Sequence, residues 1–435
     1  MIMEDEQQTK DRNNESSGRN KVIIAVFCLF LFLSGVLTLV LNSTKISATL
    51  TRIIKDNDKQ DGGIERGIRG LTKGLEETIS SGFIAKEKYI DLVGLADRML
   101  GRQYINDVDP KRDVVKDNHE LLHFLTRRMK TREVTDQLIQ LNEILKDKRI
   151  PLLYVQTPIK VMPGFTELPP SIEDYSNSNS NTFLAGLSIG GVDYFDLRSE
   201  ASKVQMNPSS MFYHTDHHWT NQTAFWAVRE VVKKLDADYS LRLDPDLFYT
   251  DSANYSFITY ENVFLGSQGR RVGRYYAGVD DYTLIVPEFT TQYKIGINKN
   301  GRSLSMREGT FENTILHKEL LDMSSSVYKN RYAAYFGADY REVQITNKKA
   351  QNLYKILVVK DSFGLPFTAF LSTMVSDIRM IDLRYFSHEH VVAYIEEFKP
   401  DAVLFVYKGL GIRYNLISEI LRLSRNLVQE ESDSR

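Results

Sequence analysis

Short apolar segments with strand character alternate with helix-length segments along most of the chain, and this alternation most constrains its fold. Candidate strands lie at Ile150–Gln156, Val192–Asp196, Leu353–Val359, Asp377–Leu383 and Ala402–Tyr407. Candidate helices lie at Glu133–Lys146, Thr223–Leu235, Leu365–Met374, Glu389–Phe398 and Leu416–Leu427. Strands and helices in alternation predict an α/β sandwich around a mostly parallel sheet.

Residues 245–345 break this rhythm. Tyr282–Val286 and Tyr293–Ile297 have the composition of strands, and a turn signal follows at Asn298–Gly301. We expect this region to be a β-rich, antiparallel insertion that could form a lid, a shelf facing the substrate or a surface for a partner.

A run of 20 residues without a charge, Val22–Leu41, precedes these segments. At about 1.5 Å per residue, it is long enough to cross a hydrocarbon core of about 30 Å. A cleaved signal peptide would have a shorter apolar core and a better cleavage site than Asn42–Thr44. The run therefore predicts an uncleaved transmembrane helix.

Basic residues before this run set its expected orientation. Arg12, Arg19 and Lys21 precede it, whereas only Lys45 and Arg52 follow closely, which favours a cytoplasmic N-terminus. We expect a single-pass protein of the cell membrane whose folded part lies outside the cytoplasm. Its predicted parts are a cytoplasmic tail (1–21), the anchor (22–41), a stalk (42–85) and one large domain (86–430).

Charge and cysteine content exclude several classes of site. The formal net charge is −2, which lacks the basic excess expected of a nucleic-acid-binding domain. The single cysteine, Cys28, lies inside the apolar run, so the chain has no intrachain disulfide and no cysteine-based zinc site.

The densest chemical signal is a cluster of three histidines in the segment Phe212–Thr220. One interpretation is a metal site, although adjacent histidines on an extended chain point to opposite faces and zinc needs ligands that converge. The other pairs Asp216 with His218, two residues apart on one face of an extended segment. An acid in that position would fix the tautomer of a general-base imidazole. His217 is then expected to face away.

Ser362 is the candidate nucleophile. It follows the apolar strand Leu353–Val359 within the segment Lys360–Gly364 and precedes a helix with Pro366 in its first turn. A serine between a parallel strand and a helix N-terminus has an exposed hydroxyl and backbone N–H groups nearby for an oxyanion. Because serine is also a common helix cap, the pattern alone does not identify a nucleophile.

Together these motifs resemble a known family. An Asp-x-His-Trp motif (Asp216–Trp219), a later strand–Asp–Ser–Phe turn (Lys360–Gly364) and the strand end Tyr154–Pro158 are similar to those of the DHHW proteins and the related SGNH-hydrolase-like proteins that acetylate alginate. The resemblance spans about Lys86 to Leu427. It implies an SGNH-like three-layer α/β/α sandwich, with Asp216 as orienting acid, His218 as base and Ser362 as nucleophile.

The resemblance also implies a substrate and a partner. Such proteins are similar to O-acetyltransferases of exported polysaccharides that work beside a membrane-bound O-acyltransferase, which supplies the acetyl group. It implies no cofactor and no metal. Further oxyanion or substrate contacts are assigned to Gln156, at a strand end, and to Trp219, which could instead be a packing residue.

Two other functions stay open on the sequence. The same three residues would serve a carbohydrate esterase that removes acetyl groups. A non-catalytic scaffold or glycan-binding subunit of an export complex is the alternative from a different class.

Overall fold

The computed structural model describes residues 85–299, 304–386 and 391–409, together with scattered residues between 25 and 51. The predicted helix Leu416–Leu427 lies outside the described residues, as do parts of the predicted span Val22–Leu41 and most of the predicted stalk. Within the described part of the chain, none of the helices combines the length and the apolar character that a membrane span requires. The chain divides into two compact units, residues 1–89 and 90–435.

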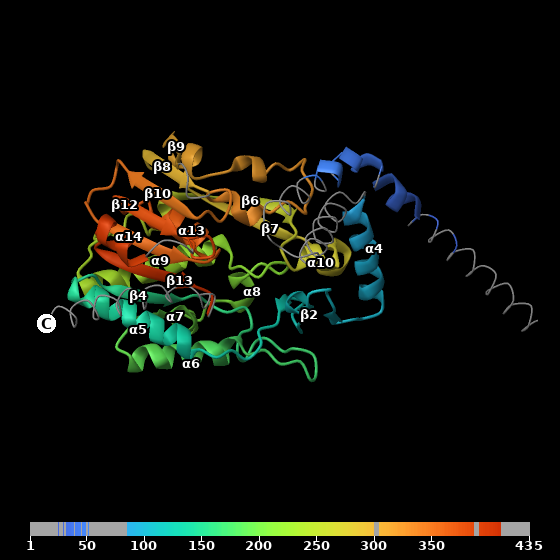
Figure 1. The fold of residues 1–435 in the computed structure, drawn as a ribbon, viewed down its shortest axis with the longest axis horizontal. Helices are drawn as coiled ribbons and strands as arrows, with labels where there is room; N and C mark the ends of the chain where they lie inside the picture. The colour runs from blue at the N-terminus through green and yellow to red at the C-terminus, as the bar shows by residue number, and fades with distance from the viewer. Residues whose placement is uncertain are drawn as a thin grey trace, which may run out of the picture. The chain divides into compact units, whose positions relative to one another are not determined.

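An eight-stranded mixed sheet forms the centre of the second unit (Figure 1). The strand order is β5-β4-β13-β11-β12-β10-β8-β9, and neighbours are parallel from β5 to β12 and antiparallel from β12 to β9. The strands are β4 (Leu152–Gln156), β5 (Asp193–Asp196), β8 (Tyr293–Asn298), β9 (Leu304–Gly309), β10 (Glu342–Asn347), β11 (Lys355–Lys360), β12 (Asp377–Ile381) and β13 (Ala402–Tyr407).

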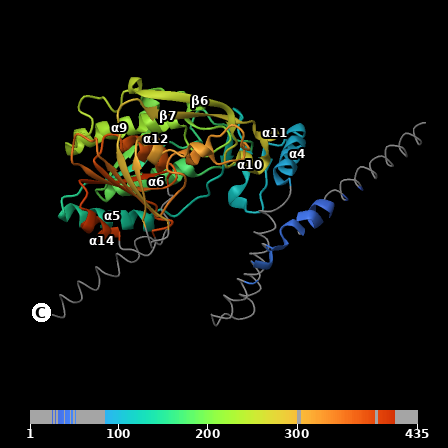
Figure 2. The same ribbon diagram turned by 90° about the horizontal axis from the view of Figure 1, so that it is seen from above.

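Helices cover both faces of the sheet (Figure 2). Alternate residues of each central strand face opposite layers: Leu357 and Val359 pack with one set of helices, whereas Ile356 and Val358 pack with the other. The first layer holds α5 (Arg132–Asp147), α6 (Ser176–Ile189) and α14 (Val391–Phe398). The second holds α7 (Leu197–Lys203), α9 (Asn221–Tyr239), α13 (Gly364–Leu371) and the hairpin of β6 (Tyr255–Phe264) with β7 (Asp280–Pro287). This is the expected three-layer sandwich.

The expectation of a mostly parallel sheet was only partly right. The strands β8, β9 and β10, all from the β-rich region, pair in antiparallel fashion and extend the sheet beyond β12. The physical reason is that the open edge of β12 offers unpaired backbone groups, which β10 satisfies. The β-rich region is therefore divided between the central sheet and the β6–β7 hairpin.

Helix α6 was not expected from the sequence. Its first half, Ser176–Asn181, consists only of serine and asparagine, which favour turns and caps over helix interiors. The buried Phe183, Leu184 and Leu187 anchor the second half in the core. Burial of these apolar side chains thus outweighs the weak local helix propensity.

Smaller elements flank the sandwich. A three-stranded sheet contains β1 (Tyr104–Ile105), β2 (Val114–Lys116) and β3 (Leu122–Phe124). Short helices lie at α8 (Pro208–Met211), α10 (Gly269–Val272), α11 (Arg274–Ala277) and α12 (Phe311–Thr314), and α4 spans Lys86–Met99.

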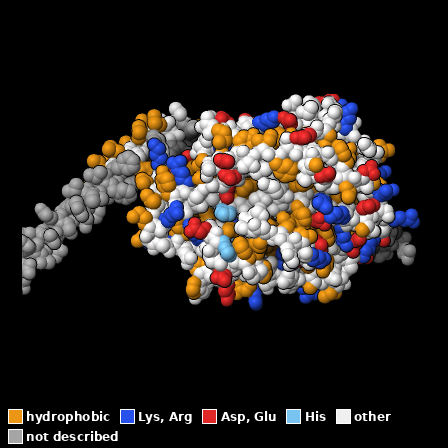
Figure 3. Space-filling model, turned by 180° about the vertical axis from the view of Figure 1, so that it is seen from behind, with side chains coloured by type: hydrophobic (Ala, Val, Ile, Leu, Met, Phe, Trp, Pro, Cys, Tyr) orange, Lys and Arg blue, Asp and Glu red, His pale blue; other side chains and the backbone are white. Residues whose placement is uncertain are grey.

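Acidic and basic side chains are interspersed over the face shown in Figure 3, and histidine side chains reach the surface near its middle.

Candidate active site

Asp216, His218 and Ser362 lie in one hydrogen-bonded chain. His218 Nδ1 is 2.5 Å from Asp216 Oδ1, and His218 Nε2 is 2.6 Å from Ser362 Oγ. Because a carboxylate only accepts, Nδ1 carries the proton, which leaves Nε2 of a neutral imidazole to accept from the serine hydroxyl. The arrangement can therefore remove a proton from Ser362.

The segment that carries Asp216 and His218 is bent rather than extended. We call residues 214–218 the histidine loop; it is closed by an antiparallel bridge between Phe212 and Trp219. Thr220 then caps α9, with its hydroxyl accepting the N–H of Thr223. The loop is thus held between a backbone bridge and a rigid helix.

The bend makes one expectation wrong. His217 does not face away: its ring centroid lies 3.8 Å from that of His218, and its Nδ1 is 2.6 Å from Ser267 Oγ. On the other side of His218, the ring of Tyr332 stacks at 3.7 Å and 8°. The base imidazole is therefore held between two rings, in an orientation that alternation along an extended strand would not produce.

Asp216 is buried and accepts three hydrogen bonds. Oδ1 accepts the backbone and ring N–H groups of His218, and Oδ2 accepts the backbone N–H of Ser267 at 2.5 Å. Burial acts to raise the pKa of this carboxyl, but the neighbouring His218 and His217 and these hydrogen bonds outweigh it and hold the pKa well below its usual value. Asp216 is therefore ionised at neutral pH.

A glycine allows this close support. A Cβ atom on Gly266 would lie 2.2 Å from Asp216 Cβ, so only glycine fits beside the acid. The preceding strand β6 and Gly266 bring the N–H of Ser267 to the carboxylate. No sequence pattern had pointed to these two residues.

Lys160 forms hydrogen bonds to the backbone of the histidine loop. Its side chain is 2% exposed, and Nζ donates to the carbonyl oxygens of His214 and Asp216 at 2.9 and 2.8 Å and to Gln268 Oε1. Burial lowers the pKa of Lys160 to about 7. Lys160 lies four residues after β4, so these hydrogen bonds connect the end of that strand to the histidine loop.

Replacing Lys160 with Met should loosen the loop. Three acceptors would lose their donor, and the two buried ones, Asp216 O and Gln268 Oε1, would each cost about 1–3 kcal/mol. We expect a lower free energy of unfolding and a kcat roughly 10- to 100-fold lower for acetyl-ester hydrolysis. Urea unfolding and steady-state kinetics measure the two effects.

The pH dependence of the unfolding free energy distinguishes the effect of the buried Lys160 amine from that of side-chain packing alone. Between pH 7 and the unfolded pKa of 10.5, the folded wild type has released the proton of Lys160 while the unfolded chain keeps it, so stability rises with pH. The rise should be smaller in Lys160→Met, where that of Lys116 and Lys408 with their lowered pKa values remains, and it should be unchanged in Lys203→Met, at an exposed position on α7. An unchanged pH profile in Lys160→Met would contradict the assignment.

Ser362 lies in a tight turn between β11 and α13. The carboxylate of Asp361 accepts the backbone N–H of Phe363 at 2.9 Å and that of Lys408, after β13, at 2.9 Å. A Cβ atom on Gly364 would lie 2.4 Å from Lys360 Cβ, so glycine is required there. Asp361 therefore shapes the turn, and Ser362 is left half-buried at the helix entry.

The two remaining sequence-predicted residues are both fully buried. Trp219 has its ring centroid 5.5 Å from that of Phe363, so it packs beneath the serine turn and does not face a substrate. Gln156 is the last residue of β4, which pairs directly with β13. Its amide nitrogen donates to the carbonyl of Thr157. A role for Gln156 in an oxyanion hole stays a prediction.

The histidine loop also brings together three side chains that could ligate a metal ion. Asp216, His217 and His218 offer ligand atoms within 4.8 Å of one another. However, both nitrogens of His218 already contact Asp216 and Ser362, and Nδ1 of His217 contacts Ser267. These partners fit an acid–base relay better than a set of free metal ligands.

A family model matches part of the chain. The family model of the SGNH hydrolase-like domain of the acetyltransferase AlgX matches residues 118–255, which include the histidine loop. No curated protein matches the sequence significantly.

Two solved structures share the fold. Bacillus cereus PatB1 carrying a sulfonyl adduct is 21% identical, with a TM-score of 0.57 over 70% of this chain and 97% of that chain. A DHHW family protein from Eubacterium siraeum is 17% identical, with a TM-score of 0.50 over 70% of this chain and 92% of that chain. These structures share the α/β fold, and the family match supports an SGNH-like fold with a mixed sheet, as the resemblance implied.

Proposed function

We propose that this chain is an O-acetyltransferase that transfers acetyl groups to hydroxyls of a polysaccharide through Ser362, His218 and Asp216. The observation that carries the proposal is the unbroken contact from Asp216 Oδ1 through the His218 ring to Ser362 Oγ. The match to an acetyltransferase domain favours acetyl as the acyl group.

The geometry suits a two-step reaction. His218 Nε2 takes the proton of Ser362 as Oγ attacks the acetyl carbonyl of the donor, and the proton passes from His218 to the leaving group. The acetyl group is then an ester of Ser362. A sugar hydroxyl next gives its proton to His218 and attacks this ester, after which the proton returns to Ser362 Oγ.

The carbonyl oxygen becomes negatively charged in each step. The backbone N–H of Ser362 lies at the N-terminal entry of α13, where helix N–H groups and the helix dipole favour an anion. We propose this N–H as one oxyanion donor.

The place of the reaction follows from the predicted anchor and is part of the proposal. The apolar run Val22–Leu41 would hold the folded domain outside the cytoplasm. An acetyl group then has to cross the membrane to reach Ser362, so a membrane-bound O-acyltransferase is the proposed donor partner.

The test offers the purified full chain an acetyl ester with and without an oligosaccharide. We expect release of the leaving group from the ester, and acetylated oligosaccharide detected by mass spectrometry when the sugar is present. Release without any acetylated sugar would favour an esterase, and no release would favour a scaffold. Loss of activity with a chelator would favour the metal interpretation.

A further inference from the structure

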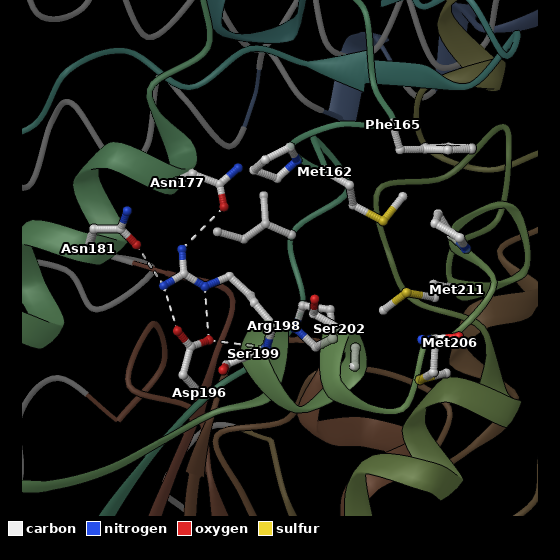
Figure 4. A pocket seen from close by; sticks show the side chains of 16 residues that line it. Met162, Phe165, Asn177, Asn181, Asp196, Arg198, Ser199, Ser202, Met206 and Met211 are labelled. Carbon is white, nitrogen blue, oxygen red and sulfur yellow. Dashed lines mark hydrogen bonds and ion pairs between the residues drawn. The ribbon is translucent and has the colours of Figure 1, made fainter.

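A cavity of about 500 Å³ opens beside the candidate active site, at the carboxyl ends of β4 and β5 (Figure 4). Its size is in the range of small-molecule sites. None of the residues that line it takes part in the Ser362 relay described above. Its position and lining nevertheless indicate what it binds.

The cavity shares its wall with the site. Ile159 lines it, and the next residue, Lys160, donates to the carbonyl of Asp216. Met211 also lines it, just before the bridge that closes the histidine loop. The strand β13 separates β4 from β11, so at a spacing of nearly 5 Å per strand the ends of β4 and β11 lie about 10 Å apart.

One half of the cavity is polar but carries no unbalanced charge. The guanidinium of Arg198 donates to both carboxylate oxygens of Asp196 and to the side-chain oxygens of Asn177 and Asn181. Arg198 and Asp196 are thus a neutralised pair whose strongest bonds are already made. An acidic ligand would gain little from such a cation. Hydroxyls of Ser199 and Ser202 continue this half.

The other half is apolar. Figure 4 shows Met162, Met206, Met211 and Phe165 across the cavity from Arg198 and the two asparagines. Phe165 is held in place because its ring stacks on His119, at 3.9 Å and 2°. Methionine side chains adapt to the shape of an occupant, and an aromatic ring offers a flat contact.

A ligand for this cavity needs hydroxyl groups on one side, an apolar face on the other, and no net charge. A neutral sugar ring has these properties, whereas a simple acyl chain would leave the polar half unused. We propose that the cavity binds an uncharged sugar ring of the acceptor polysaccharide, flanking the unit whose hydroxyl is acetylated. This inference rests on the proposed function, because that function supplies a polysaccharide acceptor.

Direct binding tests the proposal without depending on catalysis. Neutral oligosaccharides and oligosaccharides of uronic acids are titrated into the full chain, in wild type and in Ser362→Ala, with calorimetry as the readout. We expect the neutral series to bind both proteins and the uronic acid series to bind at least tenfold more weakly. Equal or tighter binding of the acidic series would overturn the proposal, as would no binding of either.

Two variants place the binding in the cavity. Ser202→Trp should fill it and weaken binding of the neutral series by tenfold or more, and Lys203→Trp, the exposed neighbour on α7, should bind as wild type does. Met206→Ala, which enlarges the apolar half, should also weaken binding and covers the case in which Ser202→Trp does not fold. Unchanged binding in folded cavity variants would refute the site.

The two proposals can fail separately. Binding that depends on the cavity but comes with no acetyl transfer by the wild type would overturn the proposed function and leave the sugar site in place. Acetyl transfer with an acceptor affinity that the cavity variants do not change would overturn the sugar site alone.

Discussion

Ser362→Ala should lower kcat for acetyl-ester hydrolysis by about 10⁴-fold or more, because it removes the only atom that can form the acyl ester in the proposed reaction. The contact of 2.6 Å to His218 Nε2 ends with the hydroxyl, and the imidazole is left without a proton to take. The loss should appear in kcat, with little change in substrate affinity, because the smaller alanine side chain adds no bulk that could obstruct a substrate.

A mass measurement and a control variant accompany this prediction. Mass spectrometry of wild type mixed with an acetyl donor should show an added acetyl group on the peptide that contains Ser362, and none in the variant. Ser188→Ala, at an exposed position on α6, serves as the matched control and should retain full activity. Comparable ester release by Ser362→Ala and wild type would remove Ser362 from the mechanism.

Asp216→Asn should cost kcat a factor on the order of 10⁴, the size seen when the acid of a serine–histidine–aspartate triad becomes an amide. Both carboxylate oxygens of Asp216 accept N–H groups, from His218 on Oδ1 and from Ser267 on Oδ2. An asparagine must turn its NH₂ group toward one of these donors. Facing His218, it stabilises the tautomer with the proton on Nε2, which cannot accept from Ser362.

The same substitution should change acid stability. The folded pKa of Asp216 is well below the usual 3.8, so the ionised acid stabilises the fold fully above pH 3.8 and loses this contribution as the pH falls toward the folded pKa. In urea, the difference in unfolding free energy between wild type and Asp216→Asn should therefore be larger at pH 7 than at pH 3. A difference independent of pH would contradict the ionised state of Asp216.

A matched control accompanies this variant. Asp238 is paired with Lys234 on the surface of α9, at 2.5 Å, so Asp238→Asn removes a carboxylate without touching the site. Exposed pairs of this kind contribute about 0–1 kcal/mol. We expect its kcat and its acid stability to match those of wild type.

Much of the architecture could be predicted because it depends on local pattern. The strand β13 has the predicted bounds, and α5 and α9 lie within a few residues of theirs, because runs of apolar residues and caps such as Thr220 act over short stretches of chain. Helix α6 was not predicted, because its serines and asparagines are helical only when Phe183 and its neighbours are buried.

For the candidate site, the sequence by itself pointed to the three side chains that we propose to react. The spacing of Asp216 and His218 predicted their pairing, whereas Ser362 was selected by its place between a strand and a helix together with the family resemblance. The tertiary structure alone decided that the histidine loop bends, that His217 and Tyr332 enclose the base, and that Lys160 and the Ser267 N–H hold the acid. These contacts join residues that are far apart in the chain, and only packing of the sandwich brings their backbone donors and rings together.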